Sequence, residues 1–151
     1  MPLSLLKLSS LLVLLFSLNS SAAESLTDAA DLQRLGAANP QEVILLMISQ
    51  DNCGYCVRVK EDYLKPMLTS ASHPPIRVLH LGKHQQVVDF DGQMRSSDSI
   101  ASRLGGRFTP TLLFVDAKGN TVHDPIVGLT TPDFYGYYLD EAIAAARKKI
   151  K

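Results

Sequence analysis

The feature that most constrains this chain is an apolar run that ends shortly before a pair of cysteines. Residues 42–49 read Glu-Val-Ile-Leu-Leu-Met-Ile-Ser, and Cys53-Gly54-Tyr55-Cys56 follows. A continuous apolar run of this length is typical of a strand that is buried on both faces. Such a strand needs helices on both sides of its sheet, so the run predicts an α/β fold. Together with the order of elements given below, in which an antiparallel pair joined near Gly119 follows crossover helices, it predicts a central mixed β-sheet flanked by helices.

The length of 151 residues argues for one domain, preceded by a removable leader. Lys7 is the only charged residue before Glu24, an apolar stretch over residues 11–16 follows it, and Ser21 and Ala23 are placed as a small-x-small cleavage signal. This order is typical of a secretory signal peptide. We expect residues 1–23 to be the signal peptide and residues 24–151 the domain.

An uncleaved membrane anchor is the alternative interpretation of the leader. An anchor needs about 20 continuous apolar residues, whereas Ser9, Ser10, Ser17 and Asn19 interrupt this stretch. No cysteine lies near the predicted cleavage point, which argues against a lipid anchor. We therefore expect a soluble protein secreted across the inner membrane into the periplasm.

The charge balance gives no indication of a nucleic-acid partner. The chain has 15 basic and 15 acidic residues, without the basic excess that a nucleic-acid footprint requires. The basic run at residues 147–151 is interpreted as a helix end, where cations suit the helix dipole.

The first half of the domain predicts alternating helices and strands. Thr27 or Asp28 is expected to cap a helix that ends near Gly36. A helix should run from the cysteine motif to about Leu68, with Pro66 bending or ending it. Strands are expected at residues 42–49 and 76–81. Crossover helices between them imply parallel strands.

The second half predicts a hairpin, two more helices and two more strands. The hairpin is expected at residues 87–92, with an Asp-Gly turn. Ser97 or Asp98 should cap a helix that ends at Leu104, before Gly105-Gly106. Strands are expected at residues 111–115 and 121–123, joined antiparallel by a turn. A long helix should begin at Pro132, with an apolar side formed by Phe134, Tyr138, Leu139, Ile143 and Ala146.

The spacing of Cys53 and Cys56 suits thiol–disulfide exchange better than structural cross-linking. By the loop-entropy model, closing four residues contributes only about 2 kcal/mol, against about 4.7 kcal/mol for a long loop. At a helix N-terminus, free N–H groups and the helix dipole stabilise a thiolate. Cys53 is therefore predicted to be the nucleophile, and Cys56, one turn deeper, the resolving thiol.

Half of a zinc site is the competing interpretation of the cysteine pair. A closed structural zinc site has four ligands. The chain has no second Cys-x-x-Cys motif and only four scattered histidines, His73, His80, His84 and His123. We predict no metal and no cofactor.

The order of these motifs resembles the thioredoxin superfamily. A buried strand, Cys-x-x-Cys, a helix, Phe108-Thr109-Pro110-Thr111 before a strand, a glycine turn at Gly119 and a closing helix follow one another as in that family. The resemblance implies a thioredoxin-like fold and a cis bond at Pro110, facing the cysteines. It also implies that Thr109, Pro110, Gly54 and Tyr55 contact substrate, with the Thr109 backbone pairing with an extended segment.

Two details refine the resemblance. The Gly54-Tyr55 dipeptide also occurs in periplasmic disulfide isomerases, but the segment between residues 76 and 109 is more similar to exported thioredoxin-related proteins of the SoxW type. The family places a buried aspartate six residues before the first cysteine and a tryptophan directly before it. This chain has Met47 and Asn52 there, so the resolving thiol must lose its proton by another route.

The functional expectation is a periplasmic thiol–disulfide oxidoreductase that reduces disulfides of exported proteins. The resemblance implies protein thiols and disulfides as substrates, a membrane electron donor of the thiol-transfer type, and a monomer. A thiol oxidase or isomerase is one alternative. The other is a non-catalytic docking module. The loss of one cysteine would favour this alternative, but both cysteines are present.

Overall fold

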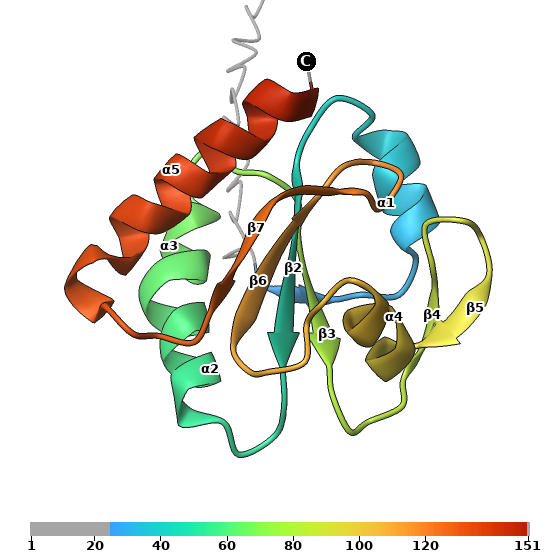
Figure 1. Ribbon diagram of the computed structural model, residues 1–151, viewed down its shortest axis with the longest axis horizontal. Coiled ribbons are helices and arrows are strands. Elements are labelled where there is room, and N and C mark those ends of the chain that lie inside the picture. The colour runs from blue at the N-terminus through green and yellow to red at the C-terminus, as the bar shows by residue number, and fades with distance from the viewer. Residues whose placement is uncertain (1–24, 151) are drawn as a thin grey trace, which may run out of the picture.

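The computed structural model describes residues 25–150, so the predicted signal peptide lies outside the described residues. Five strands form the central sheet in the order β1-β3-β2-β6-β7, as Figure 1 shows. Their bounds are β1 Thr27–Asp28, β2 Ile44–Ser49, β3 Ile76–His80, β6 Thr111–Val115 and β7 Thr121–Val127. β2 pairs parallel with β3 and antiparallel with β6, and β6 pairs antiparallel with β7. The mixed sheet predicted from the sequence is confirmed.

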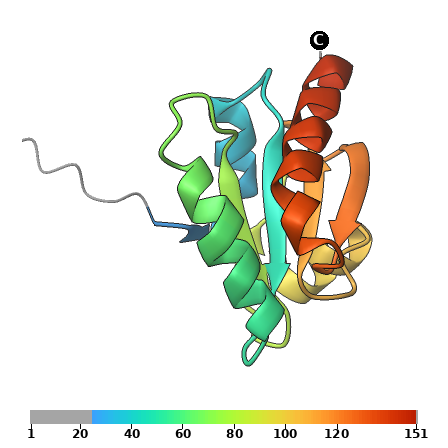
Figure 2. The ribbon, with the colours of Figure 1, turned by 90° about the vertical axis from the view of Figure 1, so that its left-hand side faces the viewer.

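Helices cover both faces of the sheet (Figures 1 and 2). On one face lie α5 (Pro132–Ile150) and a helical column made of α2 (Gly54–Val59), the π-helical η1 (Lys60–Leu64) and α3 (Lys65–Met67). On the other face lie α1 (Leu32–Ala38) and α4 (Ser97–Arg103), next to the hairpin of β4 (Gln86–Val88) and β5 (Met94–Ser96). None of the helices among the described residues is both long and apolar enough to span a membrane.

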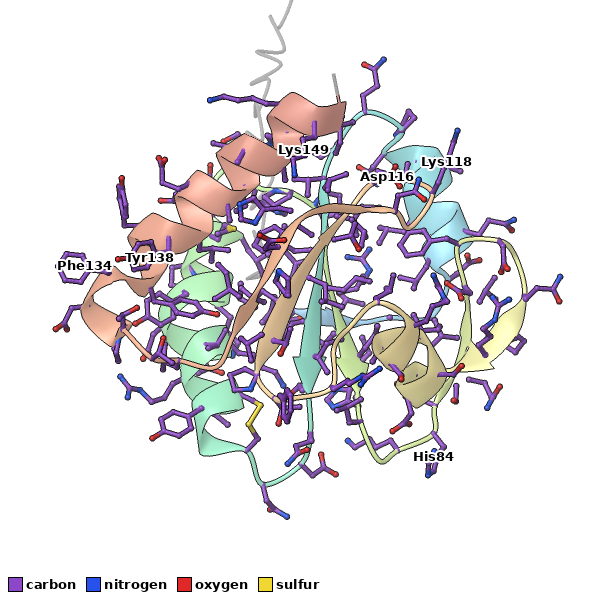
Figure 3. All side chains as sticks on the ribbon, viewed as in Figure 1. His84, Asp116, Lys118, Phe134, Tyr138 and Lys149 are labelled. Carbon is purple, nitrogen blue, oxygen red and sulfur yellow. A yellow bond between two sulfur atoms is a disulfide. The ribbon has the colours of Figure 1, made fainter. Side chains whose placement is uncertain are left out.

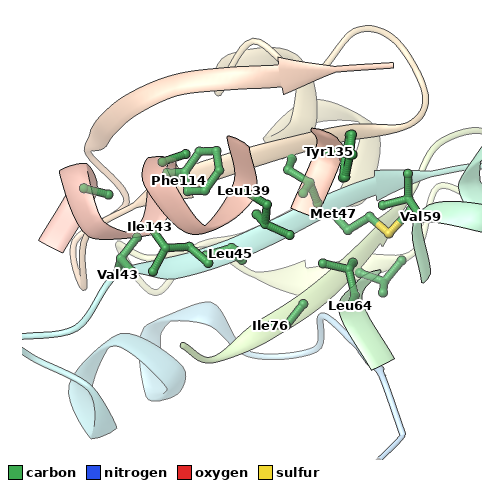
Figure 4. Packing of buried hydrophobic residues seen from close by; sticks show 14 of the residues in the cluster. Val43, Leu45, Met47, Val59, Leu64, Ile76, Phe114, Tyr135, Leu139 and Ile143 are labelled. Atoms are coloured by element: carbon green, nitrogen blue, oxygen red, sulfur yellow. The ribbon is translucent and has the colours of Figure 1, made fainter. Parts of the chain in front are cut away.

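Alternation along β2 divides the core into two clusters. Val43, Leu45 and Met47 pack under α2, η1 and α5 (Figure 4). Ile44, Leu46 and Ile48 pack under α1 and α4 on the opposite face. Because successive strand side chains point to opposite faces, one run of apolar residues supplies both cores.

The predicted N-terminal helix begins three or four residues later than expected, since its cap is Asp31 rather than Thr27 or Asp28. Thr27 and Asp28 are extended and pair with Arg77 and Val78 of β3. The cap of α1 is Asp31, whose side chain accepts a hydrogen bond of 2.7 Å from the Arg34 N–H. Either aspartate has the chemistry of a cap. Sheet pairing of residues 27 and 28 decides between them.

The helical column continues past Pro66 because the turn before this proline is a wider, π-helical turn. The Lys65 N–H reaches the carbonyl of Lys60, a spacing of five residues. A proline in a helix cannot donate a hydrogen bond and its ring crowds the carbonyl four residues earlier. The π-helical turn over η1 therefore keeps the column continuous up to Met67, near the predicted end at Leu68.

On α5, two of the predicted apolar positions are wrong. Phe134 is 62% exposed and Tyr138 is 50% exposed, and both project away from the helix in Figure 3. The buried face is made by Tyr135, Leu139, Ala142, Ile143 and Ala146. This spacing keeps one stripe against the sheet, and the two exposed aromatics lie beside that stripe rather than on it.

Smaller differences concern element ends. Ser96 caps α4, one residue before the expected cap, and β7 extends to Val127 beyond the predicted 121–123. Glycines 92, 105 and 119 have positive φ at the predicted turns, a conformation that glycine adopts without steric cost.

Leu139 provides a test of the core on the α5 face. It is 1% exposed and belongs to the cluster of β2, α2 and α5. Leu139→Ala should lower the free energy of unfolding by about 2–5 kcal/mol, because the truncation leaves a cavity. Denaturant unfolding of the oxidised protein measures this change. The control is Lys148→Ala on the exposed face of α5, for which a change above about 0.5 kcal/mol would contradict the assignment.

Candidate active site

The cysteine motif begins where the central strand ends. β2 stops at Ser49, and a turn over Asp51 and Asn52 leads into Cys53. Asn52 has a φ of 59°, in the left-handed region that asparagine tolerates better than most residues. The residue that replaces the family's tryptophan thus makes the turn that brings Cys53 to the start of α2.

Cys53 is the N-cap of α2. Its Sγ accepts a hydrogen bond of 3.1 Å from the Cys56 N–H, so the sulfur occupies the place that a serine or aspartate oxygen usually takes. α2 has no acidic residue in its first turn. Negative charge on Cys53 would therefore meet the positive end of the helix without a competing carboxylate from that turn.

The two sulfurs are joined and differ in exposure. Cys53 and Cys56 form a disulfide with a Cα–Cα distance of 5.2 Å, which Figure 3 shows as a yellow bond at the start of α2. Cys53 is half-buried, whereas Cys56 is 1% exposed and belongs to the core cluster. Only Cys53 is accessible to an external sulfur.

The segment before β6 lies at the same edge of the sheet. The Thr109-Pro110 peptide bond is cis, and Pro110 is buried while Thr109 is half-buried. Thr111 pairs with Ile48 near the end of β2, which places this segment beside the strand that leads to Cys53. Within residues 25–150, no hydrogen bond occupies the backbone N–H or C=O of Thr109. Tyr55 and Phe108 are exposed aromatics.

A sequence model of the thioredoxin-like domain matches residues 29–143. The chain belongs to the thioredoxin-like family. A thioredoxin-like domain that carries a close Cys-x-x-Cys pair is a thiol–disulfide oxidoreductase. The enzyme class predicted from the sequence is therefore confirmed.

Solved structures are similar to this chain at low sequence identity, and two of them with TM-scores above 0.5 show the same fold. Fasciola hepatica thioredoxin is 17% identical with a TM-score of 0.54, covering 79% of this chain and 97% of that one. DsbH oxidoreductase is 16% identical with a TM-score of 0.54, covering 83% and 88%. Periplasmic thioredoxin SoxS from Paracoccus pantotrophus is 19% identical with a TM-score of 0.49, covering 70% and 99%. Among curated proteins, none matches the sequence significantly.

At the position six residues before Cys53, this thioredoxin-like domain has an apolar side chain in place of a carboxylate. Met47 is fully buried in the cluster that contains Cys56. Glu42, two residues before the start of β2, is bound by Arg147, with Nε and Oε1 2.7 Å apart. The strand that carries the family's buried acid therefore supplies no acid to Cys56.

Polar side chains that sequence reasoning did not assign to the site lie in a hollow beside the disulfide. Its volume is about 510 Å³, and Ser49, Lys60 and His80 line it together with both cysteines. Burial lowers the pKa of the Lys60 ammonium below its usual value, while the carboxylate of Asp28 acts in the opposite direction. We refer to this cavity as the His80 hollow.

The sequence held partial signals for these residues. Lys60 follows Cys56 by four positions, and residues four apart share a helix face. His80 ends a strand whose alternate side chains face α2. That Ser49 lies opposite His80 depends on the register between β2 and β3, which the sequence does not give. No group of three or more His, Cys, Asp or Glu side chains placed to hold a metal occurs in residues 25–150.

The position of Cys53 predicts an acidic thiol in the reduced protein. In a Cys56→Ser background, the Cys53 pKa should lie below the value of about 8.5 for a free thiol, because helix N–H groups face its sulfur. Thiolate absorbance against pH measures it. A free cysteine peptide is the reference, and a pKa equal to that of the peptide would contradict the nucleophile assignment.

Proposed function

We propose that this protein is an exported thiol–disulfide oxidoreductase that reduces disulfides of other exported proteins. Cys53 is the attacking thiolate and Cys56 the resolving thiol. The observation that carries the proposal is the asymmetry of the pair: a half-buried Cys53 that caps α2, bonded to a Cys56 that is 1% exposed.

The reaction moves two electrons from the reduced pair to the substrate disulfide. The Cys53 thiolate attacks one substrate sulfur, and the other leaves as a thiolate that takes up a proton. Cys56 then loses its proton and attacks the Cys53 sulfur. This step forms the Cys53–Cys56 bond, breaks the bond from Cys53 to the substrate, and releases the second substrate thiol.

Substrate recognition is assigned to the rim around Cys53. The unoccupied backbone of Thr109 can pair with an extended segment, as an additional strand would. Buried Pro110 shapes the floor beside that backbone. Gly54 has no atom within 4 Å of an added Cβ, so the approach to Cys53 is open there. The exposed ring of Tyr55 offers apolar contact.

Location and electron supply follow from the predicted leader. Export through residues 1–23 would bring the domain to the periplasm, an oxidising compartment. A reductase there has to be re-reduced after each turnover. We therefore propose a membrane electron donor of the thiol-transfer type, acting on a monomer through the same exposed Cys53.

The redox potential of the pair separates a reductase from an oxidase. A reductase should lie near the value of about −270 mV known for thioredoxin, whereas a strong dithiol oxidase lies near about −120 mV. Equilibration of Cys53–Cys56 with glutathione or dithiothreitol buffers measures the potential. A value near the oxidase end would replace the reductase proposal with the oxidase or isomerase alternative.

Trapping experiments test the two cysteine roles directly. Cys56→Ser should accumulate mixed disulfides with its partners, because attack remains and release is blocked. Cys53→Ser should trap few, because the remaining thiol is buried. Non-reducing gels of the tagged, exported protein measure both, and the double Cys→Ser variant is the control. Partner binding without any covalent adduct in either single variant would instead support a docking module.

A further inference from the structure

The second half of the proposed reaction needs a proton acceptor close to Cys56. Cys56 is 1% exposed, and the side chain beneath it on β2 is the apolar Met47. A thiol that stays protonated is a poor nucleophile, and a buried thiol has little access to bulk water. The resolving step therefore depends on a base that reaches Cys56 from within the protein.

The His80 hollow is the polar space that Cys56 adjoins. It is open to solvent on one side, and Ser49, Cys53, Cys56, Lys60 and His80 line it. Ser49 and His80 lie opposite each other in the parallel pairing of β2 and β3. The ends of the two central strands thus place a hydroxyl and an imidazole in the cavity that also contains the resolving thiol.

His80 has one ring nitrogen engaged and one available. Its Nε2 lies 3.0 Å from the Asp28 Oδ1, and its side chain is 12% exposed. Its Nδ1 is buried and has no hydrogen-bond partner. A carboxylate only accepts hydrogen bonds, so we assign the ring proton of neutral His80 to Nε2. That assignment leaves a lone pair on Nδ1.

We propose that His80 accepts the proton of the Cys56 thiol during resolution, and that Asp28 positions the imidazole for this role. The inference rests on the proposed roles of Cys53 and Cys56 and adds the base that they require. The arrangement, a carboxylate behind a histidine beside a nucleophile, is a general means of activating such a group.

The proposed step transfers one proton and exchanges one disulfide bond for another. The Cys56 S–H bond breaks and its proton passes to Nδ1, which makes His80 an imidazolium bound to the Asp28 carboxylate. The Cys56 thiolate attacks the Cys53 sulfur, the Cys53–Cys56 bond forms, and the bond from Cys53 to the substrate breaks. The leaving substrate thiolate takes up the proton, and His80 returns to its neutral form.

The charged groups near His80 act in opposite directions: a carboxylate favours its imidazolium, whereas the Lys60 and Lys83 ammonium groups oppose it. Asp28 of β1 stabilises the imidazolium, and Lys60 of η1 lines the hollow and is itself within the field of Asp28, Asp51 and Lys83. Lys83 and Asp51 form an ion pair of 3.0 Å at the rim. The Lys60 ammonium would favour a thiolate on Cys56, so cation and base act together on the thiol.

Stopped-flow oxidation of the reduced protein by 5,5′-dithiobis(2-nitrobenzoic acid) tests the proposal. Attack by Cys53 releases the first nitrothiolate and resolution by Cys56 releases the second, and Cys56→Ser should show the first phase alone. His80→Gln keeps a side-chain N–H for Asp28 and removes the base. We expect its second phase to be at least tenfold slower than wild type at pH 7, with the first phase unchanged.

The pH dependence separates a base from a merely structural residue. Burial places the pKa of the Cys56 thiol above the free-thiol value of about 8.5. As the pH rises through that range Cys56 ionises without help, so the ratio of wild-type to His80→Gln second-phase rates should fall steadily from pH 7 upward. Asp28→Asn should show a smaller deficit with the same pH behaviour. The control is His84→Asn, which alters an exposed histidine outside the lining of the hollow and should leave both phases unchanged.

Two results would overturn the assignment. A second phase of wild-type rate in His80→Gln at pH 7 would show that another group accepts the proton. A deficit that stays constant as the pH rises would show that His80 only supports the structure. If instead Cys56→Ser released both nitrothiolates, the roles of the cysteines themselves would be wrong, and that failure is separate from the failure of His80.

Discussion

The structure depends on the burial of β2 on both faces. All six residues from Ile44 to Ser49 are buried, and their alternate side chains form the centres of two separate cores. The strand is bonded on both edges, to β3 and β6. A strand buried and bonded in this way opens only together with large parts of the fold, so its end is a firm support for a reactive group.

Every part of the site is attached to that end of the sheet. Cys53 follows β2 after a short turn, Thr111 pairs with its last residues, and His80 ends the neighbouring strand. These segments come from three regions of the chain. Strand pairing fixes their relative positions, so the site is set by backbone hydrogen bonds in the sheet more than by contacts among the reactive side chains.

Local patterns were sufficient for much of this architecture. The apolar run predicted β2, the glycine turns predicted the connections, and residues 111–115 are the strand that was expected. Prediction failed where two local solutions were equally good. Asp28 and Asp31 can both cap a helix, and only pairing with β3 places Asp28 in a strand. Phe134 and Tyr138 are apolar but lie off the buried stripe of α5.

The same limit explains the site residues that the sequence did not assign. Cys53, Cys56 and their order along a helix are local features, and their spacing was informative. The contact of His80 with Asp28 joins residues 52 positions apart, and it exists because the short β1 pairs with β3. Both errors have the same cause. Because Thr27 and Asp28 were expected to cap a helix, the strand β1 was missed, and with it the position of the Asp28 carboxylate next to His80.

Acidity and redox direction are coupled through Cys53. Stabilising its thiolate stabilises the reduced pair, and strong stabilisation makes a strong oxidant. Here the thiolate would face helix N–H groups, while the residues between the cysteines, Gly54 and Tyr55, carry no positive charge. Since an adjacent cation is one of the causes that lower a thiol pKa furthest, its absence from the dipeptide favours a moderate pKa. A moderate pKa agrees with the proposed reductase, in which the speed of turnover would depend on how readily the buried Cys56 is deprotonated.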